Sequence, residues 1–209
     1  MATCNGILGL VSGNVGGLTF SIRKGKQVVG MRRRKINAPP SQKQKQHRAK
    51  FTLVTKFIGS LSSLWATTFK DSRTMTAMNV AFRYNYDRVL VVADIGYTLD
   101  YANIVVSQGP LSVPESASAE VKDNNVIISW MDDRELDTAD PSDKSILVLH
   151  CPEMKRSIYN LGGAPRSSGR DFINAEIFSG KTVETWLAFI DERGKQVSWS
   201  RYAGQVLIP

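Results

Sequence analysis

The chain has 209 residues, of which 42% are hydrophobic, and a formal net charge of +8 at pH 7. This hydrophobic content is ordinary for a folded protein and argues against disorder throughout, and the length suits one large domain or two small ones. The two cysteines and two histidines match no disulfide framework or zinc-site spacing, so we expect no metal and no cofactor.

The charge is distributed unevenly along the chain. The first carboxylate is Asp71, and 13 basic residues precede it. The 139 residues from Asp71 onward carry 14 basic and 19 acidic side chains. One end of the molecule is therefore a cation, and its natural partners are polyanions or acidic protein surfaces.

Glycine recurs through the first 17 residues, at Gly6, Gly9, Gly13, Gly16 and Gly17. The spacing matches neither of the common phosphate-binding glycine motifs, so it indicates turns or close backbone packing. These glycines also break any signal-peptide helix, so we expect no secretion by a classical signal peptide. No apolar run approaches the roughly 20 residues of a membrane span.

A β-hairpin is predicted next. Residues 18–23 alternate apolar and polar side chains, as a half-buried strand does, and residues 27–32 continue as a returning strand after the turn at 24–26. Pro39 and Pro40 end this ribbon, because proline has no backbone donor for a ladder and restrains the residue before it.

The region from about 41 to 92 has helical periodicity. Ser41 followed by Gln44 is a capping-box signal, and Gly59-Ser60 is a candidate kink. We expect two helices that bury their apolar stripes on each other or on the β-hairpin. The stripes are Phe51, Val54, Ile58, Leu61 and Trp65 in the first helix, and Met75, Met78, Phe82, Tyr86 and Val89 in a second over about 74–89.

From about residue 101 onward the pattern is that of a β domain. About seven short strands with turns every 8–12 residues are typical of a β-sandwich, and the length fits an immunoglobulin- or fibronectin-like module. In the last hairpin Trp186, Ala188 and Ile190 should share one face of a strand, with the residues between them on the other. Candidate strands are 103–107, 117–122, 126–131, 145–150, 156–160, 170–177, 184–190 and 196–202.

The predicted fold class is therefore α+β. A basic glycine-rich β-hairpin and a two-helix region occupy residues 1–100, and an immunoglobulin-like antiparallel β-sandwich occupies residues 101–209.

The basic run at 32–35 is the strongest chemical candidate. Four adjacent cations on an extended segment can contact phosphates or carboxylates. The alternative is a solvated basic edge that prevents strand-edge aggregation, but a basic helix face nearby favours a binding role. The candidate polyanion- or partner-binding residues are Arg32, Arg33, Arg34 and Lys35, followed by Lys24, Lys26, Lys45, Arg48 and Lys56.

An acidic cluster spans residues 132–143. It lacks the glycine and the terminal glutamate of an EF-hand loop, so a solvated inter-strand loop is favoured. Alternatively it meets the basic end of a neighbouring copy in a head-to-tail assembly. No hydrolase or metalloprotease motif occurs, so we expect no enzyme and assign no catalytic residue.

A further set of short motifs spans the first quarter of the chain. They are Gly6-Ile7-Leu8-Gly9, Gly13-Asn14-Val15-Gly16, the Lys24-Gly25 turn, Arg32-Arg33-Arg34, Pro40, and Arg48 three residues before Phe51. Together they resemble the N-terminal signature of a domain-of-unknown-function family of similar length from Bacteroides-type bacteria and their phages. The pattern is also similar to small proteins of phage and prophage structural regions. The resemblance implies a structural role and no catalytic residue.

We therefore expect a non-enzymatic structural protein of a phage virion or mobile element, whose basic N-terminal region docks on nucleic acid or an acidic partner protein. The expected partners are nucleic acid or other virion proteins, in a homo-oligomer or larger assembly, located in a virion or the bacterial cytoplasm. The alternative is a cytoplasmic protein that binds nucleic acid independently of sequence. A carbohydrate-binding module is a third interpretation, which requires exposed rings at Trp130, Trp186 and Trp199.

Overall fold

The structure is a computed structural model that describes residues 3–4, 11–23, 25–33, 39–69, 75–93, 96–131 and 139–209. The chain forms two units, Met1–Ser41 and Gln42–Pro209. Most of its strands are antiparallel, and a few helices accompany them, so the fold class is α+β.

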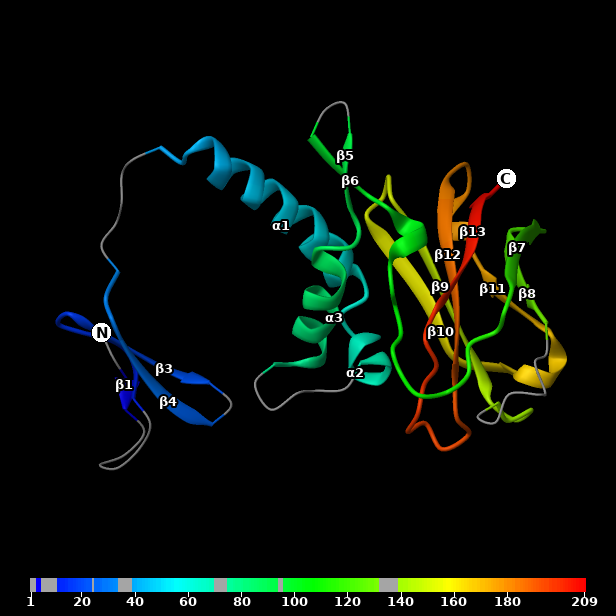
Figure 1. Cartoon of the computed structure of the whole chain (residues 1–209), viewed down its shortest axis with the longest axis horizontal. Helices are drawn as coiled ribbons and strands as arrows, with labels where there is room; N and C mark the ends of the chain where they lie inside the picture. The colour runs from blue at the N-terminus through cyan, green and yellow to red at the C-terminus, as the bar shows by residue number, and fades with distance from the viewer. Residues whose placement is uncertain are drawn as a thin grey trace. The chain divides into compact units, whose positions relative to one another are not determined.

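The N-terminal unit is a four-stranded antiparallel sheet in the order β1-β2-β3-β4 (Figure 1). The predicted hairpin is confirmed, because residue 18 pairs with 31 and residue 23 with 26. Gly16 and Gly25 take φ of +54° and +73° in the two tight turns, a conformation that costs glycine little. Part of the glycine-spaced stretch forms a strand where its spacing predicted only turns. The strands are β1 (Thr3–Cys4), β2 (Val11–Val15), β3 (Leu18–Arg23) and β4 (Lys26–Met31).

Three helices open the second unit: α1 (Gln42–Ser60), α2 (Trp65–Thr68) and α3 (Ala77–Tyr86). The first predicted helix thus ends at Ser60, where the sequence suggested only a kink. The Ser60 hydroxyl donates to the Phe57 carbonyl at 2.7 Å, a local bond that competes with helical hydrogen bonding. A short hairpin of β5 (Leu90–Ala93) and β6 (Gly96–Leu99), which the periodicity did not predict, follows α3.

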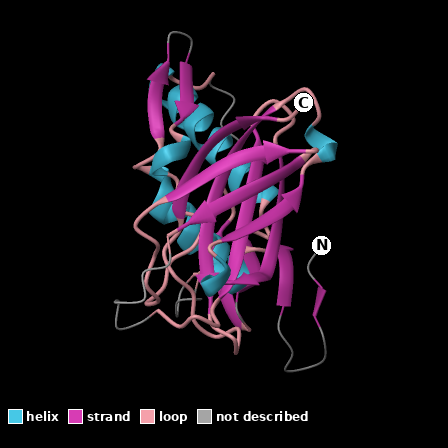
Figure 2. Ribbon diagram, turned by 90° about the vertical axis from the view of Figure 1, so that its right-hand side faces the viewer, coloured by secondary structure: helices cyan, strands magenta, loops and turns pink. Residues whose placement is uncertain are grey.

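Two antiparallel sheets complete the second unit, in the orders β10-β9-β12-β13 and β11-β8-β7 (Figure 2). Six of the eight predicted strands are recovered within a few residues. The bounds are β7 (Ala117–Lys122), β8 (Asn125–Trp130), β9 (Lys144–Cys151), β10 (Arg156–Pro165), β11 (Arg170–Asn174), β12 (Thr182–Ile190) and β13 (Arg201–Leu207).

Two strand predictions are wrong. Residues 103–107 form no strand, because the side chain of Asn85 takes both backbone groups of Val105, donating to its carbonyl at 3.0 Å and accepting from its N–H at 2.9 Å. The last strand begins at Arg201 instead of residue 196. The described residues also contain three 3-10 turns, at Tyr101–Asn103, Arg166–Ser168 and Glu176–Phe178.

Hydrophobic cores lie on both faces of the β10-β9-β12-β13 sheet. Along β12, Trp186 and Ala188 face the core beneath the helices, while Leu187 and Phe189 face the core between the two sheets, as the predicted alternation requires. The helices share this core with the sheet and also pack on each other, with the ring centroids of Phe51 and Phe82 5.0 Å apart, so the expected contact between the two helices is confirmed. The expected domain boundary near residue 100 consequently falls inside the second unit. The helical share of the first core is Val54, Phe57, Ile58, Leu61, Leu64, Trp65, Phe69, Ala77 and Ala81.

The tryptophans predicted to be in or near the core are largely inside it. Trp186 is fully buried and Trp130 is 6% exposed, while Trp199 is partly covered. Because glycan binding needs exposed aromatic faces, the burial of Trp130 and Trp186 argues against the carbohydrate interpretation, while Trp199 stays partly exposed.

A buried ion pair ties the loop before β9 to the turn after β10. Arg166 and Asp143 are both 1% exposed, with an Nη2 to Oδ2 distance of 3.4 Å. The guanidinium also donates to the Ser112 carbonyl at 2.7 Å and lies 3.8 Å from the ring centroid of Phe189. Burial raises the pKa of Asp143, so its ionised form depends on the neighbouring cation.

Replacing Arg166 by Met is expected to lower the free energy of unfolding by about 3 kcal/mol, because it leaves the Asp143 carboxylate buried without a cation. Adding Asp143→Asn should recover part of this loss, since a neutral amide costs less to bury. Urea unfolding followed by tryptophan fluorescence measures both. A double variant less stable than Arg166→Met alone would contradict the explanation.

A second buried titratable group lies where α1 meets the sheet. His150 is 3% exposed, its Nδ1 lies 2.8 Å from the Ser157 hydroxyl, and its ring packs edge-on against Phe57. Burial lowers the pKa of His150 to about 4. The same environment raises the pKa of Tyr101 to about 12, first through burial and then through the charge of Glu184.

The fold should therefore lose stability in acid through His150. The unfolded chain takes up a proton below about pH 6.5, whereas the folded histidine stays neutral down to about pH 4, so stability falls as the pH drops through this window. We expect a loss of about 3 kcal/mol in the wild type that is missing from His150→Gln. Thermal unfolding of both proteins at intervals across the window measures the difference, and parallel curves would refute the assignment.

Candidate polyanion-binding groove

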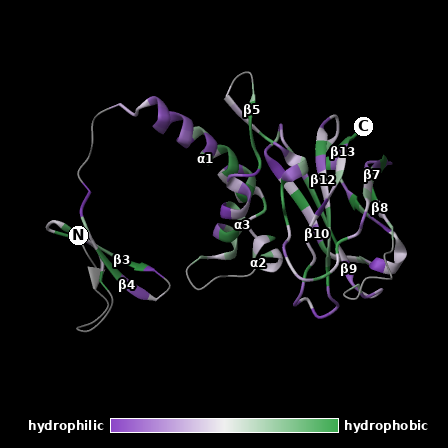
Figure 3. Ribbon diagram, in the orientation of Figure 1, coloured by the Kyte–Doolittle hydropathy of each residue, from purple (hydrophilic) through white to green (hydrophobic). Residues whose placement is uncertain are grey.

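Helix α1 presents an exposed, basic first half. Every residue from Gln42 to Ala49 is exposed, and the first turn contains no acidic residue. Figure 3 shows this half as hydrophilic, whereas the second half becomes hydrophobic where it reaches the sheet. The helix is therefore anchored by its C-terminal half and offers its N-terminal half to a partner.

One side of α1 and the β5–β6 hairpin enclose a groove of about 610 Å³. Because positions three, four, seven and eleven apart share one helix face, Lys45, Arg48, Thr52 and Lys56 all line it. Lys155, from the turn between β9 and β10, supplies a fourth cation. The remaining lining residues are Gln46, Ala49, Leu53, Gly96 and Tyr97, and none of the ten is acidic.

An aromatic ring gives the groove a second kind of contact. Tyr97 lines its β6 side, and the Lys50 ammonium lies 4.6 Å from the centroid of that ring, in cation–π geometry. A fifth cation is thereby placed beside the groove. Leu53 and Ala49 make part of the surface apolar.

This combination suits a ligand with repeated negative charges and flat apolar groups. The ammonium groups act as point charges, and Arg48 can grip a phosphate or carboxylate with two parallel hydrogen bonds. Tyr97 and Leu53 offer a surface for a base or an apolar side chain. The lining contains no carboxylate, histidine or cysteine, so it holds no group that titrates near neutral pH.

The structure divides the predicted binding residues between the two units. Lys45, Arg48 and Lys56 come together in the groove. Lys26, Arg32 and Arg33 are exposed in the N-terminal unit, where Lys26 begins β4 and the two arginines follow its end. The other three, Lys24, Arg34 and Lys35, lie outside the described residues.

Sequence reasoning missed three contributors to the groove: Lys50, Tyr97 and Lys155. Lys155 is about a hundred residues away from α1 in the chain and occupies a left-handed turn position with φ of +53°. Tyr97 belongs to a hairpin that the periodicity did not reveal. No local pattern could have joined Tyr97 and Lys155 to α1, because only the packing of the helix on the sheet brings them near it.

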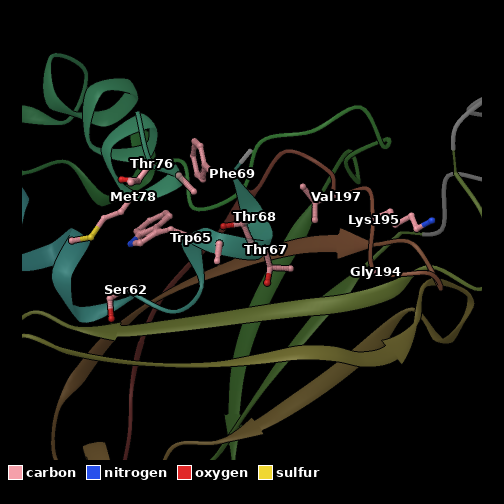
Figure 4. Close-up of a pocket in the computed structure, with 12 residues that line it drawn as sticks. Ser62, Trp65, Thr67, Thr68, Phe69, Thr76, Met78, Gly194, Lys195 and Val197 are labelled. Carbon is pink, nitrogen blue, oxygen red and sulfur yellow. The ribbon is translucent and has the colours of Figure 1, made fainter. Parts of the chain in front are cut away.

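A second hollow of about 620 Å³ lies between α2, the start of α3 and the turn after β12 (Figure 4). Hydroxyl and apolar side chains such as Thr67, Thr76 and Met78 line it, with Lys195 at one end. Its lining also lacks carboxylates, histidines and cysteines. The charge pattern therefore distinguishes the α1 groove from this hollow.

Most of the acidic cluster predicted as a solvated loop or calcium site lies outside the described residues. Of its members, Asp140 accepts hydrogen bonds from Ser142, and Asp143 belongs to the buried ion pair. Within the described ranges, no group of three His, Cys, Asp or Glu side chains could hold a metal ion.

The comparisons with known proteins agree with the resemblance at the level of the family. No helix in the described part of the chain is long and apolar enough to span a membrane. A comparison with curated proteins finds no match. A model of a family of unknown function, DUF6266, matches residues 10–204, which is nearly the whole chain. The Bacteroides origin and the phage setting stay predictions. Because the family model covers nearly the whole chain, the chain belongs to the DUF6266 family.

Proposed function

We propose that this protein is a non-enzymatic docking protein that binds a polyanion, foremost nucleic acid, through the α1 groove and the basic N-terminal unit. The observation that carries the proposal is the groove itself, which four cations and a tyrosine line and no acidic residue lines. Such a surface binds by neutralising phosphates, so affinity should be independent of sequence and strongly dependent on salt. An acidic partner protein is the other ligand of the same chemistry.

The energetics of α1 support a binding role. A helix N-terminus carries a partial positive charge, so cations in its first turns destabilise it, typically by 0.3–1 kcal/mol each. Lys43 and Lys45 lie at this end with no acidic residue in the first turn to offset them. A bound polyanion would neutralise both the side chains and the helix end. The arrangement is unfavourable for the isolated fold and favourable for a complex.

The setting we propose is an assembly, as a structural protein of a phage virion or mobile element. This part rests on the resemblance described above. A cytoplasmic protein that binds nucleic acid outside any particle is the alternative, and mass spectrometry of purified particles from the native source distinguishes the two. The proposal assigns no catalytic step and no cofactor.

We further propose that the two-sheet part is an immunoglobulin- or fibronectin-like module. The first, second and fifth of its seven strands form one sheet, and the third, sixth and seventh belong to the other. This follows the immunoglobulin constant pattern except that the fourth strand, β10, joins the second sheet. In this proposal the module presents the groove and its outer surfaces to neighbours.

Neutralising Lys45, Arg48 and Lys56 together to Gln should weaken binding of a short single-stranded oligonucleotide by at least roughly ten-fold at low salt. The slope of log affinity against log salt should become shallower by about 2, because each lost phosphate contact removes about 0.7 for single strands. Fluorescence anisotropy over a salt series measures both quantities.

The matched control changes Lys122, Arg170 and Arg193 to Gln, which removes the same charge from exposed positions elsewhere in the second unit. Equal losses of affinity in the two triple variants would show a general effect of charge and would contradict the assignment of binding to the groove. Competition with polyglutamate tests the other ligand class. If polyglutamate binds and the oligonucleotide does not, the partner is an acidic protein.

A single substitution at Lys45 should move stability and binding in opposite directions. Lys45→Glu places a favourable charge near the helix N-terminus and is expected to raise the free energy of unfolding by about 0.5 kcal/mol while weakening oligonucleotide binding. Lys56→Glu should weaken binding without that gain, because it lies in the C-terminal half of α1. Denaturant unfolding beside anisotropy gives both readouts, and a Lys45→Glu protein that loses stability would contradict the dipole argument.

A further inference from the structure

The N-terminal sheet has one apolar and one polar face. Directly paired residues share a face, so the pairs Leu18–Met31, Phe20–Val29 and Val15–Leu18 place five large apolar side chains together. Ile22 lies on the same face by alternation along β3. The opposite face carries Ser12, Asn14, Thr19, Ser21, Arg23, Lys26 and Val28.

The described residues of the N-terminal unit do not cover the apolar face. Among the residues described in Met1–Ser41, none with a known exposure is buried, and Val29 and Met31 are 52% and 86% exposed. A small sheet needs its apolar face packed against another layer to be stable. Large exposed apolar patches on a folded protein mark interaction sites. We therefore expect the apolar face of the N-terminal sheet to bind a partner that has an apolar surface of its own.

Charge restricts what that partner is. The apolar face itself bears no charge, but Arg23 and Lys26 sit at one end of the β3–β4 ribbon, and Arg32 and Arg33 follow its other end. Two such sheets stacked face to face with their strands aligned would place like charges near one another at both ends of the stack. A nucleic-acid backbone offers phosphates but no apolar face to match. The complementary surface is apolar and surrounded by carboxylates.

The rest of the chain carries both exposed apolar side chains and carboxylates, the two components that such a surface needs. All 19 of its acidic residues lie from Asp71 onward, where they outnumber 14 basic ones, while the N-terminal 70 residues have none. The β-rich part also exposes large apolar side chains, including Met131, Phe172 and Leu207 at 67%, 62% and 65%. Exposed carboxylates occur on the same sheets and their turns, among them Glu120, Asp123 and Glu176, although Lys122 and Arg170 also lie near Phe172.

We propose that the apolar face of the N-terminal sheet packs on the β-rich part of a second copy of the chain, which gives a head-to-tail assembly. Such a contact joins two different surfaces, so a pair of copies leaves one N-terminal sheet and one β-rich surface free, and the assembly can extend or close into a ring. The inference goes beyond polyanion binding, because it uses apolar residues of the other unit.

Two neighbouring valines allow a matched test on the full chain. Val29 lies on the apolar face opposite Phe20, and Val28 lies on the polar face opposite Ser21, with exposures of 52% and 41%. Val29→Glu should shift self-association to roughly ten-fold higher concentration or more, whereas Val28→Glu, which changes the net charge equally, should shift it less than about two-fold. Analytical ultracentrifugation without nucleic acid measures association, and circular dichroism checks that both variants fold.

The direction of the contact is tested by mixing and by salt. In a head-to-tail assembly, Val29→Glu chains still offer a receptor, so adding them to wild type should shorten the assemblies, and raising the salt should dissociate them. A wild type that stays monomeric, or variants that behave alike, would overturn the proposal. A third outcome would be dimers that do not extend, are unaffected by added Val29→Glu chains and associate more strongly at high salt. That outcome would indicate symmetric stacking of two sheets and would also overturn the proposal.

These outcomes are separable from those for the groove. Oligonucleotide binding depends on α1 cations, which the valine variants leave intact. Lost self-association with retained binding would leave the groove proposal standing, and the reverse pattern would leave the assembly proposal standing.

Discussion

Strands β9 and β12 lie next to each other at the centre of the larger sheet and are buried on both faces, and the second unit is arranged around that burial. Trp186 and Val148 receive the helices on one face, while Leu187 and Leu149 meet the second sheet on the other. With both faces covered, two layers must stack on a single sheet. This is why the helices cannot be separated from the β-rich part as an independent domain.

The same packing positions the basic groove. The C-terminal half of α1 carries Val54, Phe57 and Ile58 into the core, and this anchors a helix whose first half makes no buried contact. The free half then projects its cations beside β6 and the β9–β10 turn. A rigid helix held at one end keeps the spacing between charges constant, so the cations form a shaped surface, unlike those of a flexible basic tail. The cost is an N-terminal helix end with cations in place of acidic residues.

The two units differ in how far they bury their apolar side chains. The second unit covers its own apolar surface with two cores, and Asn85 and the Arg166–Asp143 pair show how buried polar groups in it find partners. The first has an amphipathic sheet with the alternation of a stable β structure, but its described residues place no layer against the apolar face. A cationic unit that lacks its own core suits a role in which folding is completed by contact with a partner.

Several features follow from the sequence alone, because they depend on local patterns. Period-two alternation predicted β3 with β4 and the faces of β12, period-3.6 stripes predicted α1 and α3, and the acid-free first 70 residues predicted a cationic end. His150 and Cys151 face opposite cores, as adjacent strand residues must. The short motifs of the first quarter also indicated the family.

Tertiary structure decided the rest. The Asn85 side chain binds the backbone where a strand was expected, and Lys155 and Tyr97 join the α1 cations only through packing across long sequence separations. Local periodicity specifies which face of an element is apolar, but it does not say which surface will cover that face. For the helices the covering surface includes the sheet beneath them, whereas no described residue of Met1–Ser41 covers the apolar face of the N-terminal sheet.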